Sequence, residues 1–201
     1  NKSMLTVLQE TTFFYEINKS KFYTFLFPIE NEEDFKIRLK ALKKEHNKAR
    51  HHCYAYILQD KQKSNDDNEP AGSAGLPILE NLKNKQLQNV GLVVVRYFGG
   101  IKLGRSNLAR TYGFCAQEII KAAPIKEVVE QAIYEVVFGY DLVNVVDRFL
   151  EKRALILDKN FEEEVCYKLT CPDETLINEL IDTCLGQIQV KKLENTELVI
   201  G

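Results

Sequence analysis

The 201-residue sequence lacks long apolar runs, and no stretch approaches the roughly 20 apolar residues that a membrane-spanning helix needs. Its first residues also lack the basic, apolar and small-residue order of a secretory signal. We therefore expect a cytoplasmic protein with no membrane partner. Repeats and low-complexity segments are missing as well. The apolar fraction of 45% and the charged fraction of 28% are those of an ordinary globular protein.

Cysteine occurs in an odd number and without a C-x-x-C pair. This pattern argues against a disulfide framework and against a zinc knuckle. Cys166 and Cys171 have four residues between them and no histidine nearby, so a metal pair is disfavoured. We expect reduced, mostly buried thiols, no resident metal and no cofactor. The five cysteines are Cys53, Cys115, Cys166, Cys171 and Cys184.

Charge is unevenly distributed along the chain. Lys and Arg outnumber Asp and Glu by 20 to 14 in residues 1–129, a net charge of +6. In residues 130–201 they are outnumbered by 15 to 7, a net charge of −8. The first excess favours a polyanionic partner and the second repels one, although uneven charge is also found on ordinary solvated surfaces.

Hydrophobic periodicity predicts strands and helices in residues 1–129. Two apolar stretches flank the polar turn "NKS", which predicts a β-hairpin. A helix is expected from Asn31, which can cap it, because three acids occupy its first turn. The polar segment 59–75 is longer than an ordinary connector, which favours a functional loop. The expected strands are 12–17, 21–29, 51–58 and 90–98, and the expected helices are 31–46, 76–86 and 106–123.

The pattern restarts after an expected connector at 123–130, in the order β-α-β-β-α-β of a ferredoxin-like sandwich. Asp141 and Pro172 are expected at the starts of two helices, and "KNFEE" is expected to form a turn. The expected strands are 131–140, 154–158, 163–171 and 186–200, and the expected helices are 141–153 and 172–185. We place the boundary near 128–130, which predicts an α+β protein with domains 1–129 and 130–201.

The stretch "RYFGGIKLGRSNLAR" combines cations, aromatics and glycines where a strand turns into a helix. Glycine allows positive φ and close approach of the backbone, and the first amides of a helix attract anions. Neither G-x-x-x-x-G-K-[ST] nor G-x-G-x-x-G is present. Two interpretations stay open: an anion- or RNA-binding site, or a tight corner. The candidate residues are Arg96, Tyr97, Phe98, Gly99, Gly100, Lys102, Gly104, Arg105 and Arg110.

The stretch "DDNEPAGSAG" groups three carboxylates ahead of two glycines. Carboxylates can bind a divalent metal or exchange protons. The stronger interpretation is structural, because acids cap the amides of a following helix and Ser73 can serve as its N-cap.

The stretch "RHHCYAY" is expected to be a strand. Its alternation places His51 with Cys53 on one face and His52 with Arg50 on the other, so the two histidines cannot hold one metal. A Cys–His nucleophile pair would need a third, orienting group. We assign no catalytic residue. The residues expected to support a loop site are Arg50, His52, Asp67, Glu69 and Ser73.

These residues resemble the IMPACT family with its bacterial YigZ-type members. The blocks "HHCYAY", "EPAGSAG" and "ARTYG" are similar to blocks that the family shares. The resemblance covers essentially the whole chain and is strongest over 15–125. The positions that follow the family's signature spacing without a gap are Gly75, Ile78, Leu79, Leu82, Leu87, Val93, Val94, Arg96, Tyr97, Phe98, Gly99, Gly100, Leu103 and Gly104.

Two positions depart from the family pattern. Asn68 stands where the family usually has glycine, and we expect the loop shape to survive because Asn tolerates left-handed backbone. After Gly104 the family usually has small residues and another glycine pair, whereas this chain has "RSN". Arg105 makes the start of the helix more cationic.

The resemblance implies an N-terminal α/β domain similar to the second domain of a small-subunit ribosomal protein. It also implies a ferredoxin-like C-terminal domain similar to the last domain of elongation factor G, and a role around translation. Our leading hypothesis is a non-enzymatic regulator that binds RNA, the ribosome or a translation-control protein through residues 1–129. Because residues 130–201 are acidic and poor in aromatics, we expect no RNA binding there.

Two other functions remain open. One is an enzyme that acts on a phosphorylated or nucleotide substrate, with phosphate held at 99–105 and with Asp67 or Glu69 binding metal or a proton. This alternative requires the acidic loop and the glycine corner to line one pocket. The other is a pure protein-interaction module.

Overall fold

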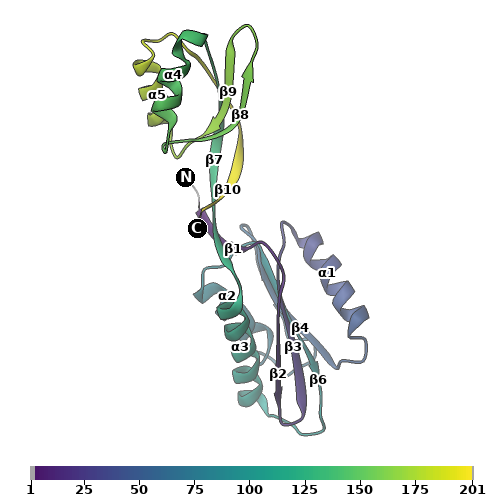
Figure 1. The fold of residues 1–201 in the computed structure, drawn as a ribbon. Helices are drawn as coiled ribbons and strands as arrows, with labels where there is room; N and C mark the ends of the chain where they lie inside the picture. Colours follow the sequence, from purple (N-terminus) through teal and green to yellow (C-terminus); the bar gives the residue numbers. More distant parts are fainter. Residues whose placement is uncertain (1–2, 201) are drawn as a thin grey trace. The chain divides into compact units, whose positions relative to one another are not determined.

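The computed structural model describes residues 3–200. Contacts divide them into two compact units, Met4–Glu127 and Val128–Ile200, the second of which also includes Ser3. Each unit has a β-sheet and helices, which makes the protein an α+β fold (Figure 1). The division into domains 1–129 and 130–201 stays a prediction.

The first unit is built on a five-stranded antiparallel sheet in the order β2-β3-β6-β4-β5. Figure 1 shows α2 and α3 on one side of this sheet and α1 on the other. β1 lies outside it and bridges Leu5 to Leu87. The strands are β1 (Ser3–Val7), β2 (Thr11–Ile17), β3 (Ser20–Pro28), β4 (His51–Ile57), β5 (Gln62–Asn65) and β6 (Val90–Tyr97), and the helices are α1 (Glu32–Glu45), α2 (Gly75–Asn84) and α3 (Arg105–Ala122).

The predicted hairpin is confirmed as β2 and β3. Its two-residue turn consists of Asn18 and Lys19, both with positive φ (49° and 65°). Such a turn matches the twist of the paired strands. The predicted capping of α1 is also confirmed, because the Asn31 side chain accepts a hydrogen bond from the backbone N–H of Asp34.

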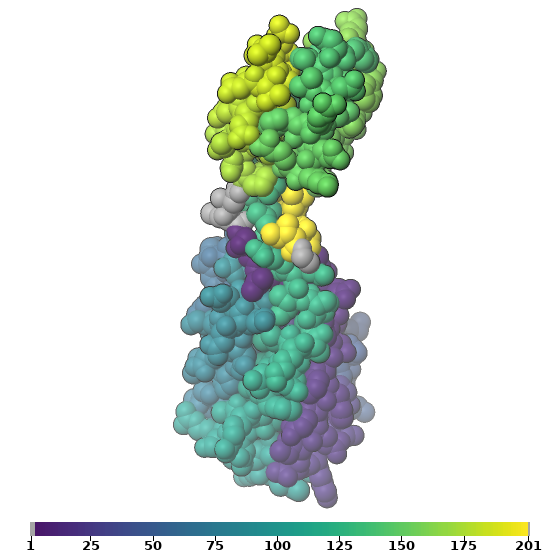
Figure 2. Space-filling view, turned by 60° about the vertical axis from the view of Figure 1, so that its left-hand side comes forward, coloured from purple at the N-terminus to yellow at the C-terminus, as the bar shows by residue number. Residues whose placement is uncertain are grey.

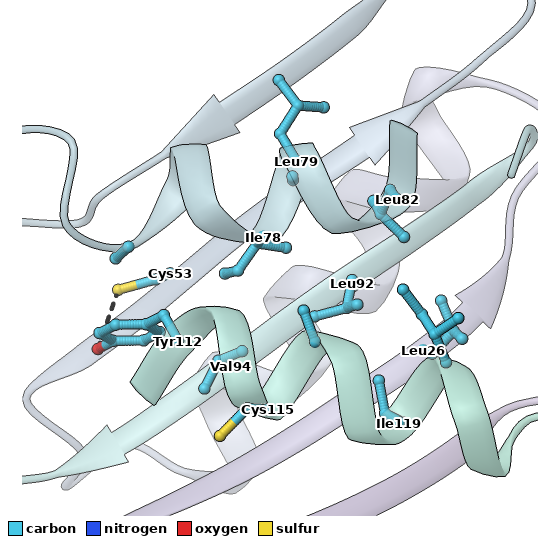
Figure 3. Close-up of a cluster of buried hydrophobic side chains, with 14 of the residues drawn as sticks. Leu26, Cys53, Ile78, Leu79, Leu82, Leu92, Val94, Tyr112, Cys115 and Ile119 are labelled. Atoms are coloured by element: carbon cyan, nitrogen blue, oxygen red, sulfur yellow. Dashed lines mark hydrogen bonds between the residues drawn. The ribbon is translucent and has the colours of Figure 1, made fainter. Parts of the chain in front are cut away.

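β6 is the central strand and is buried on both faces, as its apolar run predicts. One face packs under α2 and α3, where Leu92 and Val94 meet Ile78 and Ile119 (Figure 3). The other face carries Val93 and packs under α1. The alternation of side chains along β6 therefore determines which of its residues join each of the two cores.

The expected loop 59–75 is partly wrong. Its residues Gln62–Asn65 form β5, which pairs with the end of β4. The polar composition of this segment reflects an exposed edge strand, because its outer side has no further strand to cover it.

The second unit has the predicted ferredoxin-like order. β10 pairs with β7, and the sheet continues through β9 to β8. Tyr134, Val136 and Tyr167 are buried in one core with residues of both helices. The elements are β7 (Ile125–Phe138), a 3₁₀ turn (Tyr140–Leu142), α4 (Val143–Leu150), β8 (Leu155–Phe161), β9 (Val165–Thr170), α5 (Glu174–Thr183) and β10 (Gln189–Ile200).

Several expected boundaries in this half are wrong. The connector expected at 123–130 is largely strand, since β7 starts at Ile125. Asp141 lies inside the 3₁₀ turn and caps no helix. α5 begins at Glu174 rather than at Pro172, and its N-cap is Asp173, whose side chain accepts a hydrogen bond from the N–H of Thr175. The turn expected at 159–163 begins later, because β8 runs to Phe161.

Among residues 3–200, no helix is both long enough and apolar enough to cross a membrane.

Candidate functional site

Arg96 and Glu69 form a buried ion pair beneath the predicted glycine corner. Arg96 lies on β6 and is 4% exposed, and Glu69 lies in the loop before α2 and is 8% exposed. The Arg96 Nη1 atom lies 2.7 Å from Oε2 and 3.0 Å from Oε1 of Glu69. Its Nε and Nη2 atoms lie 3.4 Å and 3.2 Å from the Ser20 hydroxyl oxygen. The guanidinium is therefore paired inside the protein and does not face solvent.

Three further side chains complete what we call the Arg96–Glu69 network. The Tyr112 hydroxyl donates to Glu69 Oε2 at 2.6 Å, and Cys53 Sγ donates to the Tyr112 oxygen at 3.3 Å (Figure 3). His51 Nε2 lies 3.4 Å from Glu69 Oε1. The members of the network are Ser20, His51, Cys53, Glu69, Arg96 and Tyr112.

The protonation of this network follows from its geometry. His51 Nδ1 lies 2.7 Å from the carbonyl oxygen of Asp67, and a carbonyl only accepts, so Nδ1 carries a proton. Burial raises the pKa of the Tyr112 hydroxyl well above its usual value, and burial also raises the pKa of the Cys53 thiol. Both groups stay protonated at neutral pH. A protonated, buried thiol is a poor nucleophile.

The loop before α2 is held by its own acids. Asp66 accepts hydrogen bonds from the backbone N–H groups of Gly72, Ala74 and Gly75 at 2.9, 3.1 and 2.8 Å. Asp66 thereby caps α2 from a position several residues earlier in the sequence. This is the structural role expected for the acids of this loop. Ser73 is not the cap that we expected, because its hydroxyl donates to the carbonyl of Pro70 at 2.5 Å.

Asp67 and His52 are joined on the other side of β4. The backbone N–H of His52 donates to Asp67 Oδ2 at 2.6 Å. Burial lowers the pKa of the His52 imidazole, and its Nε2 lies 3.0 Å from the carbonyl of His46. Asp67 and Asn68 adopt left-handed backbone (φ 42° and 69°), the conformation that Asn tolerates.

The glycine corner is confirmed in its backbone geometry. A Cβ atom at Gly99 would lie 1.9 Å from the carbonyl oxygen of Lys19, so the corner packs directly on the hairpin turn. Gly100 and Gly104 have positive φ (94° and 78°), and Gly104 is the N-cap of α3 without a side-chain hydrogen bond.

The predicted cations separate into two groups. Arg96 is buried in the network, which corrects the expectation that it adds to an exposed anion site. Lys102 and Arg105 are exposed, and no salt bridge involves either of them among residues 3–200. Arg110 is exposed and donates to the Asn107 side chain at 2.9 Å. Arg50 is exposed and lies 4.6 Å from the ring centre of Phe98.

The two predicted aromatics have different surroundings. Tyr97 belongs to the α1 side of the sheet, where its hydroxyl lies 2.6 Å from His46 Nδ1. Phe98 contacts two guanidinium groups, that of the exposed Arg50 at 4.6 Å and that of the buried Arg96 at 5.5 Å from its ring centre.

The acidic loop and the corner are neighbours, whereas the enzyme alternative requires that they line one pocket. Glu69 pairs with Arg96, and a Cβ at Gly72 would lie 3.5 Å from the Arg105 guanidinium. They do not share the 820 Å³ groove that α3 lines together with β2 and α2, whose walls include Arg110 but neither Asp67 nor Glu69. Figure 2 shows α3 at the surface between the purple N-terminal strands and the bluer segment that contains α2. Within residues 3–200, no group of three or more His, Cys, Asp or Glu side chains is placed to hold a metal ion.

Comparison with known proteins agrees with the family resemblance that these blocks carry. The model of the Impact N-terminal domain matches residues 18–120. The chain belongs to the IMPACT family. It is 35% identical over 188 residues to an IMPACT family member of Haemophilus influenzae. The matched region covers 89% of this chain and 91% of that protein.

Other IMPACT family members match with similar coverage. The chain is 34% identical over 166 residues to YvyE of Bacillus subtilis, covering 81% of this chain and 74% of YvyE. It is 29% identical over 188 residues to YigZ of Escherichia coli, covering 89% and 92%. A crystal structure described as that of a hypothetical protein has a TM-score of 0.64 and 28% identity, covering 96% of this chain and 98% of the other.

The three blocks that carry the resemblance meet in the Arg96–Glu69 network. "HHCYAY" supplies His51 and Cys53, "EPAGSAG" supplies Glu69, and "ARTYG" supplies Tyr112. Sequence reasoning did not foresee this network. Strand alternation was the available signal, because it places His51 and Cys53 on one face, but it does not show which side chain covers them.

Proposed function

We propose that this protein is a non-enzymatic, translation-associated RNA-binding protein whose first unit presents a basic surface to RNA. Membership of the IMPACT family supports a role in translational regulation. The positive charge of the first half and the negative charge of the second support the placement of the RNA on the first.

The exposed cations at the corner carry this proposal. Arg50, Lys102 and Arg105 are exposed, and no salt bridge among residues 3–200 neutralises them. Lys102 and Arg105 flank Gly104, the N-cap of α3, where no side chain makes a capping hydrogen bond. Unpaired cations beside uncapped helix amides favour phosphate oxygens.

The buried ion pair supports the same surface indirectly. Arg96 and Glu69 tie β6 to the loop before α2, and both segments flank the corner. A rigid corner keeps its cations in place before RNA arrives, which lowers the ordering cost of binding. In this proposal Arg96 is a positioning residue rather than a phosphate ligand.

A filter-binding titration of the full chain with structured RNA tests the proposal. Affinity should fall steeply as salt rises, because phosphate contacts displace counterions. Replacing Lys102 and Arg105 with Gln should weaken binding and make the salt dependence shallower by about 0.7 to 0.9 per lost phosphate contact. Lys168→Gln removes an exposed charge from β9 in the second unit and serves as the matched control.

Four outcomes would count against the proposal. Absence of binding at low salt, or binding that salt does not affect, would remove its electrostatic basis. An equal loss of RNA affinity in the Lys168→Gln control would indicate that the RNA-binding surface belongs to the second unit. If a protein captured from cells stays bound after nuclease treatment while purified RNA does not bind, that result would instead indicate a protein-interaction module.

A further inference from the structure

A row of aromatic rings lies on the α1 side of the first sheet, beyond the edge of α1. Phe14 of β2 and Tyr23 of β3 are directly opposed in the strand register, and their ring centres are 4.9 Å apart. Tyr97 of β6 lies next along the row, with its ring centre 5.7 Å from that of Tyr23. Phe14 is 49% exposed, which is unusual for so large an apolar ring.

The fold leaves the outer end of this row, Phe14, exposed, whereas Tyr23 and Tyr97 are half-buried against the α1 core. α1 packs on Phe27 and Tyr56, and the cluster beneath it contains no residue of β2, a strand that is described in full. The α1 face of β2 is exposed at Thr12, Phe14 and Glu16. His46 at the end of α1 fixes the inner part of the row, because it contacts the ring of Tyr23 and hydrogen-bonds with Tyr97.

Lysines border the row. Lys21 lies directly opposite Tyr97 in the register, Lys19 is in the hairpin turn, and α1 ends with Lys43 and Lys44. All four are exposed, and no salt bridge among residues 3–200 involves them. Two acids, Glu16 and Glu45, are also exposed nearby, so lysines exceed acids by four to two.

We infer that Phe14, Tyr23 and Tyr97 form a stacking platform for the bases of single-stranded RNA. Every base has a flat face that stacks on an aromatic ring, and lysines beside the rings attract the backbone phosphates. In duplex RNA the base faces are stacked within the helix and cannot reach the rings. The platform therefore prefers single strands.

The platform and the glycine corner approach each other at the hairpin turn, because a Cβ at Gly99 would lie 1.9 Å from the carbonyl oxygen of Lys19, two residues before Lys21. We expect one strand of RNA to contact the corner cations with its phosphates and the platform with its bases. The inference rests on the proposed function and adds to it a preference for unpaired RNA.

The absence of tryptophan makes a direct test possible. In the full-length Phe14→Trp variant the new indole is the chain's single tryptophan, and stacking on a base should quench its fluorescence. The probe is an oligouridylate of about 8 nucleotides, within the site sizes found for single-strand binders. Quenching should follow the same titration curve as filter binding. Phe161→Trp is the matched control, because Phe161 is 54% exposed but lies on β8 of the second unit.

A second pair of variants separates stacking from folding. Phe14→Val keeps a strand-forming residue but removes the ring, and should weaken oligouridylate binding by about tenfold or more. Phe14→Tyr keeps the ring and should bind as the unmodified chain does. Binding of a duplex RNA of the same length should be unchanged in both variants.

The outcomes distinguish this inference from the proposed function. If RNA binds, but the indole at 14 is not quenched or Phe14→Val binds normally, the platform is wrong and the basic surface stands. If no RNA binds at low salt, both fail. The Phe14→Val variant could keep its RNA affinity but fail to bind a protein partner whose binding survives nuclease treatment. In that case the exposed row is a protein interface and the inference is overturned.

Discussion

The Nη1 atom of Arg96 lies 2.7 Å from the Oε2 atom of Glu69, and both side chains are buried. A charge in this environment is stable only while its partner is present. Tyr112 and His51 also face the Glu69 carboxylate, so its loss affects several groups at once.

We predict that Glu69→Gln lowers the free energy of unfolding by about 3–5 kcal/mol, because Arg96 is left as an uncompensated buried charge. Urea denaturation measures the change. The control is Glu10→Gln, which breaks the more exposed pair with Arg38 and should cost about 1 kcal/mol or less. Equal effects in the two variants would show that the buried pair has no special role.

We predict that Gly99→Ala is far more destabilising than Gly100→Ala. The first places a Cβ 1.9 Å from the Lys19 carbonyl oxygen, so the corner must separate from the hairpin turn. The second meets no atom within 4 Å and costs about 1–2 kcal/mol for its positive φ. Thermal unfolding of both variants measures the difference, and a Gly100→Ala variant that melts first would contradict it.

We predict that the cysteines react in an order set by burial. Cys166 is partly exposed and should be alkylated first in the native protein. Burial raises the pKa of Cys115 to about 12 and also raises that of Cys53, so both stay thiols and should react only when the first unit opens. Timed alkylation followed by mass spectrometry measures this order. Early labelling of Cys115 would show that this core is loose.

We predict that His52 reduces stability in weak acid. Burial lowers its folded pKa below the ordinary value of 6.5, so the unfolded chain takes up the proton first. The stability present above pH 6.5 is therefore lost as pH falls below it. Urea denaturation between about pH 8 and about pH 5 should show this decline, and His52→Gln should reduce it. An unchanged pH dependence in the variant would exclude His52 as its source.

We predict that residues 130–201 do not bind RNA. Tyr134, Phe138 and Tyr167 are buried in the core of the second unit and cannot stack on bases, and the exposed Tyr140 and Phe161 belong to a segment of net negative charge. The segment 130–201 has 15 acids against 7 bases. Filter binding of the separate fragment, with circular dichroism to verify that it folds, measures this. Tighter binding by this fragment than by the full chain would contradict the charge argument.

Local features of the fold could be predicted from the sequence. The hairpin turn at Asn18 and Lys19, the Asn31 cap and the buried run of β6 depend on residues within one element. Backbone geometry links such short patterns directly to structure. The boundaries that failed, such as the start of β7 at Ile125, depend on which strand is available to pair.

The candidate site was predicted only in part for the same reason. The glycine corner could be expected from residue type, because glycine adopts positive φ without strain, as Gly100 and Gly104 do. The role of Arg96 could not be expected in this way, because it depends on contacts between distant elements. Its partner Glu69 is 27 residues away in sequence, and Tyr112 is 43 residues from Glu69. Strand period assigns a side chain to a face, but packing of distant elements decides whether that face meets solvent or a buried carboxylate.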